Sequence, residues 1–211
     1  MNLSGVFDLT ARTVLLVEGE SDRAAIEALA SRWALPLGAH AVQVVPMGGV
    51  TNVGHHLTAL AAHPVPVRVG GLYDSAEERV VLKALERAGR RVPGDTTPLS
   101  ALGFFGCERD LEDELVRALG VDGCLEVIAA QGALRSFERL RRQPAQQGWT
   151  VPQVLHRFLG SGSGRKERYA RLFTEAIPQG RVPEPLDGVL RWALRDEPPP
   201  PLPFETEATS L

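Results

Sequence analysis

The sequence lacks the features that mark membrane, secreted and zinc-binding proteins. It has two cysteines, Cys107 and Cys124, which are too few for a disulfide framework and do not form a metal-type pair. Its longer apolar runs, such as residues 13–17, are broken within a few residues, whereas a bilayer span needs roughly 18. Residues 1–12 also lack the apolar block of a signal peptide. We therefore expect a soluble, cytoplasmic protein with no membrane association.

The composition is that of a globular chain. Its 211 residues suit one ordinary domain, or one domain with a small appendage. Hydrophobic residues make up 44% and charged residues 23%, which is enough apolar material for a core. Residues 196–211 are the exception, because prolines occupy every position from 198 to 201 and few apolar residues follow. We expect this segment to be a disordered, proline-rich tail.

The net charge of −3 conceals an asymmetry along the chain. Residues 1–132 contain 11 Lys and Arg against 17 Asp and Glu, and residues 133–195 contain 12 against 5. Residues 196–211 add four acids and no base. An acidic half joined to a basic half suggests that one part binds cations and the other contacts a polyanion. A chance distribution of surface charges explains the counts equally well.

Strand and helix patterns alternate over the first half of the chain. Short apolar runs predict buried strands at residues 13–17, 41–45, 66–73 and 102–106. A helical pattern follows each of them, at residues 21–33, 52–62, 76–89 and 111–119. This alternation predicts a parallel sheet covered by helices on both faces, in an α/β domain spanning residues 1–130.

From residue 121 onward the strand pattern stops. Helical patterns continue at residues 125–130, 134–142, 151–159, 166–177 and 186–194. Glycines and prolines separate these segments, as expected of connections between helices. We therefore expect residues 131–195 to form a basic helical extension.

Carboxylates follow the predicted strands at the positions where a parallel sheet binds its ligands. Glu18 comes directly after the first strand and Asp22 begins the next helix. Asp74 follows the third strand, and Asp110 and Glu112 follow the fourth. Like charges at one edge repel each other unless a cation lies between them, and oxygen ligands suit Mg²⁺ or Mn²⁺. Each acid alone is more often a helix N-terminal charge, but three successive strand ends are harder to explain in that way.

These residues resemble a known family. The segment Val17-Glu18-Gly19-Glu20-Ser21-Asp22 is similar to the glutamate motif of the Toprim domain. Gly48-Gly49 and Asp74 fit the same pattern in the same order. Asp110-Leu111-Glu112 and a helical segment carrying Arg165-Lys166 make the chain most similar to the Toprim part of the OLD (overcoming lysogenization defect) family of ATP-dependent endonucleases. The resemblance covers about residues 13–194 and implies a Toprim-like, Rossmann-like sheet with a helical C-terminal extension.

The resemblance also implies an activity and its residues. It implies a metal-dependent endonuclease that hydrolyses DNA phosphodiester bonds, with Glu18 and Asp22 holding one Mg²⁺ or Mn²⁺ ion. Asp74 would bridge toward a second ion, with Asp110 or Glu112 completing that site. Lys166 would stand beside the scissile phosphate, so Glu18 and Lys166 are the expected catalytic residues. Two such ions clamp the attacking water and the leaving oxygen of an in-line displacement.

Two departures from the family keep an alternative open. The family has Asp-x-Asp after the third strand, but this chain reads Asp74-Ser75-Ala76, and Ala76 cannot ligate. Glu77 or Glu78 is an alternative ligand, but one residue further along an α-helix a side chain points about 100° away. The family also has an ATPase domain before the Toprim part, so we expect either a separate ATPase subunit acting in trans or a stand-alone form. The alternative is a catalytically degenerate Toprim protein that binds nucleic acid or another partner.

Basic residues on two predicted helices support contact with DNA. At their spacings they can form a stripe along phosphates: Arg135, Arg139, Arg142, Arg165, Lys166, Arg168 and Arg171. Few aromatic residues lie among them, so the expected contact is with the DNA backbone and largely independent of sequence. A solvated helix face is an equally common reading. The five histidines form no recognisable ligand set.

Overall fold

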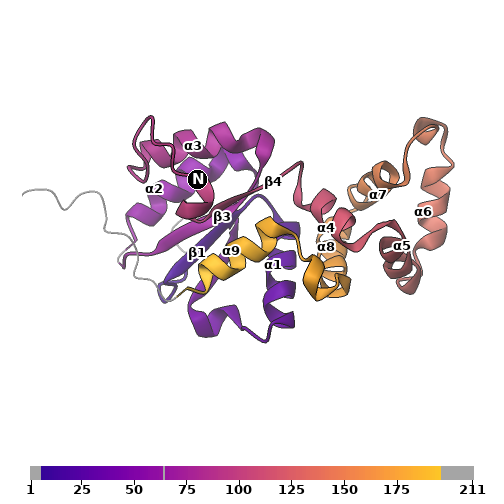
Figure 1. The fold of residues 1–211 in the computed structure, drawn as a ribbon, viewed down its shortest axis with the longest axis horizontal. Helices are drawn as coiled ribbons and strands as arrows, with labels where there is room; N and C mark the ends of the chain where they lie inside the picture. The colour runs from indigo at the N-terminus through magenta and orange to yellow at the C-terminus, as the bar shows by residue number, and fades with distance from the viewer. Residues whose placement is uncertain (1–5, 64, 196–211) are drawn as a thin grey trace, which may run out of the picture.

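The computed structural model describes residues 6–63 and 65–195, and in them it has a four-stranded parallel sheet (Figure 1). The strands lie in the order β2-β1-β3-β4, with bounds β1 (Thr13–Val17), β2 (Val42–Pro46), β3 (Arg68–Asp74) and β4 (Phe104–Cys107). Val17 pairs with Pro46, and Asp74 pairs with Cys107, so the carboxyl ends of the strands meet at one edge. The predicted parallel α/β sheet is confirmed.

Helices cover both faces of this sheet (Figure 1). On one face lie α1 (Glu20–Arg32) and α9 (Glu184–Ala193), and on the other α2 (Val53–Ala61) and α3 (Glu78–Arg87). Every side chain of β1 is buried, as its continuous apolar run predicts for a strand covered on both faces. Leu15 contributes to the core beneath α1 and α9, and its neighbour Leu16 to the core beneath α2 and α3.

A group of helices extends beyond the end of β4 (Figure 1). Its members are α4 (Leu111–Leu119), α5 (Val121–Ala130), α6 (Leu134–Arg141), α7 (Val151–Leu159) and α8 (Arg165–Ala176). Aromatic rings join three of them: the centroid of Phe158 lies 5.6 Å from that of Phe137 and 5.8 Å from that of Tyr169. Helix α8 then packs along α1, where Arg32 donates a hydrogen bond of 2.6 Å to the carbonyl of Thr174.

The helical character predicted after residue 121 is present, but some element boundaries differ from the prediction. Residues Ser75–Glu77 form a 3₁₀ turn rather than the first turn of an α-helix. Helix α5 begins at Val121, four residues earlier than its apolar pattern suggests. The predicted tail at residues 196–211 lies outside the described residues. No helix of residues 6–63 and 65–195 has the length and apolarity of a membrane span.

Helix α9 is fixed to the sheet by Trp192. A Cβ atom added to Gly103 would lie 2.4 Å from the Trp192 ring, and one added to Gly70 would lie 2.7 Å from it. The buried guanidinium of Arg68 stacks 4.2 Å from the ring centroid and donates a 2.8 Å hydrogen bond to the Trp192 carbonyl. The absence of a side chain at the two glycines therefore leaves space for the indole of Trp192, which packs between α9 and the sheet.

We predict that Gly103→Ala destabilises the protein more than Gly94→Ala. Both glycines have positive φ, +90° and +82°, so both substitutions bring backbone strain of about 1–2 kcal/mol. Only Gly103 faces Trp192, whereas nothing lies within 4 Å of a Cβ at Gly94. Overpacking should add about 1–3 kcal/mol at Gly103. Denaturant unfolding measures the difference, and equal losses for the two variants would contradict the packing account.

Candidate metal centre

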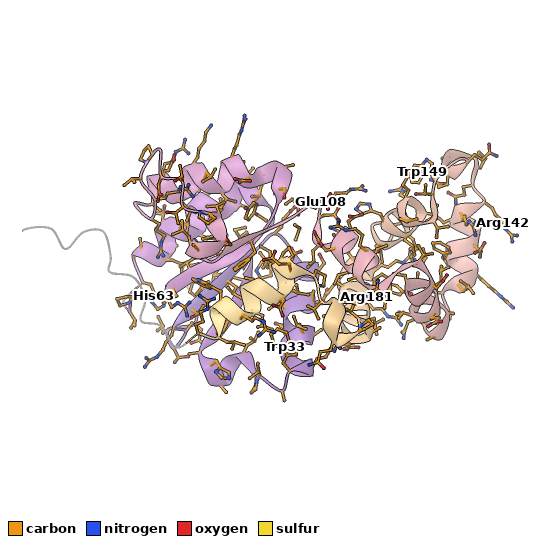
Figure 2. The ribbon with its side chains drawn as sticks, in the orientation of Figure 1. Trp33, His63, Glu108, Arg142, Trp149 and Arg181 are labelled. Carbon is orange, nitrogen blue, oxygen red and sulfur yellow. The ribbon has the colours of Figure 1, made fainter. Side chains whose placement is uncertain are left out.

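A cleft of about 490 Å³ lies at the carboxyl edge of the sheet, between the sheet and the group of helices beyond β4. Figure 2 shows Glu108 at this junction, in the loop that leads from β4 to α4. All the candidate site residues inferred from the sequence line this cleft: Glu18, Asp22, Asp74, Asp110, Glu112 and Lys166. The structure therefore brings together residues that are up to 148 positions apart in the chain.

Glu18 is held in place by the Gly48-Gly49 pair. The backbone N–H groups of both glycines donate to the Glu18 carbonyl at 3.1 Å. Gly48 has φ +70° and Gly49 has φ +115°, a backbone conformation that residues with a side chain rarely adopt. The loop after β2 is thereby fastened to the loop after β1, while the Glu18 carboxylate remains exposed at the cleft.

The Glu18 carboxylate meets two others, those of Asp74 and Glu77. One ligand oxygen from each of the three residues lies within 4.8 Å of the other two. Desolvation, followed by the charges of Glu18, Asp110, Glu77 and Asp22 in that order, raises the pKa of Asp74 to about 7. Desolvation and the charge of Glu18 also raise the pKa of Glu77. Such a cluster is poised to exchange protons for a cation.

The 3₁₀ turn explains why Glu77 joins this cluster. In a 3₁₀ turn, residues i and i+3 lie one above the other, whereas the first turn of an α-helix would direct residue 77 elsewhere. Asp74 immediately precedes the turn and Glu77 ends it. The hydroxyl of Ser75 anchors the turn by donating a 2.7 Å hydrogen bond to the Cys107 carbonyl at the end of β4. The expectation that Glu77 points away is therefore wrong, because it assumed α-helical geometry.

Asp22 lies in the first turn of α1, four positions after Glu18. Its Oδ2 accepts a 2.8 Å hydrogen bond from the Gly19 backbone N–H, which fixes the side chain across the β1–α1 turn. The pKa of Asp22 is raised to about 7, chiefly by desolvation; the hydrogen bond from the Gly19 N–H opposes this shift, and the charge of Glu112 adds to it. A carboxylate in these surroundings gains strongly from a neighbouring cation.

Glu112 and Lys166 form an ion pair at the opposite wall. Lys166 Nζ lies 3.0 Å from Glu112 Oε2, and the Glu112 side chain is 3% exposed. The other oxygen, Oε1, is buried without a hydrogen-bond partner among the described residues. Burial alone would lower the pKa of Lys166, but the charges of Glu112, Asp22 and Asp110 raise it overall. Lys166 is therefore charged, and a buried carboxylate oxygen lacks a partner.

Asp110 is engaged by two neighbours. As the N-cap of α4, its Oδ1 accepts a 2.8 Å hydrogen bond from the Asp113 backbone N–H. Its Oδ2 lies 2.6 Å from His156 Nε2, on α7. Arg109 Nε is 3.8 Å from the same oxygen, which is too long for a hydrogen bond.

Residues 9–70 match the family model described as the TOPRIM domain of proteins like the overcoming lysogenization defect protein. This segment is similar to an OLD-like Toprim domain. Two solved structures have the same fold over most of the chain. The C-terminal region of the OLD protein from Xanthomonas campestris pv. campestris is 25% identical, with a TM-score of 0.66 over 88% of this chain and 93% of the other. The C-terminal region of the Burkholderia pseudomallei OLD protein is 19% identical, with a TM-score of 0.64 over 87% and 97%.

No curated protein matches the chain at a significant level. The resemblance to the OLD family and the fold expected from it are confirmed by the family match and by the two C-terminal regions. The family match ends before Asp74, so the sequence match itself covers only Glu18 and Asp22 among the candidate ligands. The roles of the individual site residues remain predictions.

Two residues that contact the cleft residues were not chosen from the sequence. Glu77 lies three positions after Asp74, and that spacing would have identified it had the turn been recognised as 3₁₀. His156 is 46 positions from Asp110 and belongs to a helix whose sequence pattern indicates only packing. No sequence signal connects His156 with Asp110.

We predict that the metal-free protein loses thermal stability as the pH rises from 5 to 8.5. A carboxyl group whose pKa is about 7 in the folded state, against an ordinary pKa of 3.8, binds more protons in the folded than in the unfolded protein between these two pH values. Its stabilising effect is present below the unfolded pKa and is lost as the pH rises through the folded pKa. Melting temperatures in EDTA test this, and Asp22→Asn should flatten the profile. A profile unchanged by Asp22→Asn would contradict it.

Proposed function

We propose that this OLD-like Toprim domain is a divalent-metal-dependent nuclease that hydrolyses DNA phosphodiester bonds. The observation that carries the proposal is a pair of buried carboxylate oxygens with no hydrogen-bond partner among the described residues: Glu112 Oε1 in the cleft, and Glu77 Oε2 beside the cleft residues Glu18 and Asp74. Burying such an oxygen without a partner is costly unless a ligand satisfies it. An all-carboxylate donor set suits Mg²⁺ or Mn²⁺.

We assign the carboxylates to two groups, one for each ion. Glu18, Asp74 and Glu77 are the three carboxylates that come within reach of a single ion. Asp22 and Glu112 interact electrostatically with each other, and they would hold the second ion together with Asp110. When bound, the two ions would supply a more acidic water and a clamp for the attacking and leaving oxygens.

Lys166 provides a positively charged side chain to the cleft. Its ammonium group is held 3.0 Å from Glu112 and lines the cleft, where it would face the scissile phosphate. A fixed positive charge at this place stabilises the negative charge that develops on the phosphate oxygens. Helix α8 supplies this lysine from its first turn, and the packing of α8 on α1 fixes its position.

The arginines of α6 would contact the DNA backbone outside the cleft. Arg135, Arg139 and Arg142 recur at spacings of four and three, which place them along one side of the helix, where they line a shallow groove. No ion pair involves these three within the described part of the chain, whereas Arg171 lies 3.6 Å from Glu175. Figure 2 shows Arg142 at the end of the molecule farthest from the sheet. Unpaired cations at such a surface suit phosphate contacts that do not read base sequence.

The alternative of a catalytically degenerate binding module rests on Ala76. Glu77 weakens that alternative, because its carboxylate lies beside those of Glu18 and Asp74, where the family's second aspartate is missing. The OLD resemblance also suggests an ATPase subunit, and the proposal includes such a partner acting in trans. Metal binding and the effect of Glu77 distinguish the nuclease from the degenerate module.

We predict that the protein nicks or linearises plasmid DNA in Mn²⁺, and that Glu18→Ala lowers the rate at least about 100-fold through loss of a ligand. Glu27→Ala is the matched control, because Glu27 lies on α1 in an exposed ion pair with Arg23. The control should retain wild-type cleavage, and EDTA should abolish cleavage in both active proteins. Equal background cleavage by wild type and Glu18→Ala would contradict the nuclease proposal.

We predict that Glu77→Gln weakens Mn²⁺ binding about 10-fold or more, since the amide keeps the size of the side chain but removes its charge. Glu78→Gln, at the adjacent exposed position, should leave binding unchanged. Isothermal titration of the metal-free proteins measures both affinities. If the two variants bind Mn²⁺ as tightly as wild type, Glu77 does not replace the missing aspartate.

A further inference from the structure

His156 is the one histidine in the described residues with a hydrogen bond to a candidate metal ligand. Its Nε2 lies 2.6 Å from Asp110 Oδ2, and its side chain is 31% exposed, against 19% for Asp110. The two residues come from different helices, α7 and α4, which pack against each other. This contact therefore joins the group of helices beyond β4 directly to the rim of the cleft.

The placement of His156 is rigid. Helix α7 is anchored by Val154, Leu155, Phe158 and Leu159, which are all buried. Thr150 and Gln153 cap its start, where the Gln153 side chain accepts a 2.8 Å hydrogen bond from the Thr150 N–H. The imidazole is thus presented to Asp110 by a fixed helix rather than by a mobile loop.

Asp110 depends on this contact for its orientation. The Asp113 N–H holds Oδ1, and rotation about that single hydrogen bond would still move Oδ2. His156 holds Oδ2, and Arg109, at 3.8 Å and largely exposed, does not take its place. Each carboxylate oxygen has two lone pairs, so both oxygens keep accepting capacity for a cation while they are held.

We propose that His156 is a positioning residue of the metal centre, which fixes the Asp110 carboxylate toward the cleft from the neighbouring helix. The inference rests on the proposed function, because it requires that Asp110 ligate a cation. Outer-shell partners of metal ligands typically contribute 10- to 100-fold to metal affinity by holding the ligand in its binding geometry.

The test compares His156→Ala and His156→Gln by isothermal titration of the metal-free proteins with Mn²⁺. The glutamine amide nitrogen is as many bonds from the backbone as the histidine Nε2, so it can donate the same hydrogen bond. We expect His156→Ala to weaken one Mn²⁺ site about 10- to 100-fold and His156→Gln to restore most of that loss. His55→Ala, at an exposed position on α2, is the control and should bind as wild type. Melting temperatures establish that each variant is folded.

Two results would overturn the role of His156 alone, and a third would overturn the metal centre as well. Wild-type Mn²⁺ affinity in folded His156→Ala would overturn the role of His156 and leave the nuclease proposal intact. Equal loss in folded His156→Ala and His156→Gln would show that the hydrogen bond is not what matters, and would overturn it too. Absence of Mn²⁺ binding in the wild type would refute the metal centre itself and, with it, the role of His156.

Discussion

Repulsion between carboxylates confined at one sheet edge is the constraint on which this structure depends. Two like charges about 4 Å apart repel by roughly 4 kcal/mol in surroundings of intermediate polarity. Parallel strands with short loops bring Glu18 and Asp74 together, and the turn after β3 adds Glu77. Without a cation, the raised pKa values of Asp22 and Asp74, about 7 each, show that the cleft favours protons instead. Such a site costs stability, which is expected of residues arranged for function.

The compensating groups come from the helices beyond β4. Lys166 on α8 pairs with the buried Glu112, and His156 on α7 contacts Asp110. In both contacts, a residue of a later helix, α7 or α8, meets a residue at the N-terminus of α4. The packing of α8 along α1 then ties this wall of the cleft to the β1–α1 turn. The helical region therefore forms one wall of the candidate site.

The sequence was sufficient for the sheet and for most of the acidic edge. A continuous apolar run such as residues 13–17 predicts a strand buried on both faces, and the position of an acid directly after such a run predicts its edge. Local pattern was not sufficient for Glu77, because the choice between a 3₁₀ turn and an α-helical turn is made by contacts such as that between Ser75 and Cys107. It carried no information on His156, whose partner is set by how two helices pack.

The central claim is that Glu18, Asp74 and Glu77 converge to hold a divalent cation. Anomalous diffraction from a crystal of this protein grown in Mn²⁺ tests that claim most directly. The account predicts an anomalous peak in contact with carboxylate oxygens of all three residues, with a second peak toward Asp22 and Glu112. Electron density showing the three carboxylates with water alone, in a crystal holding Mn²⁺, would contradict it.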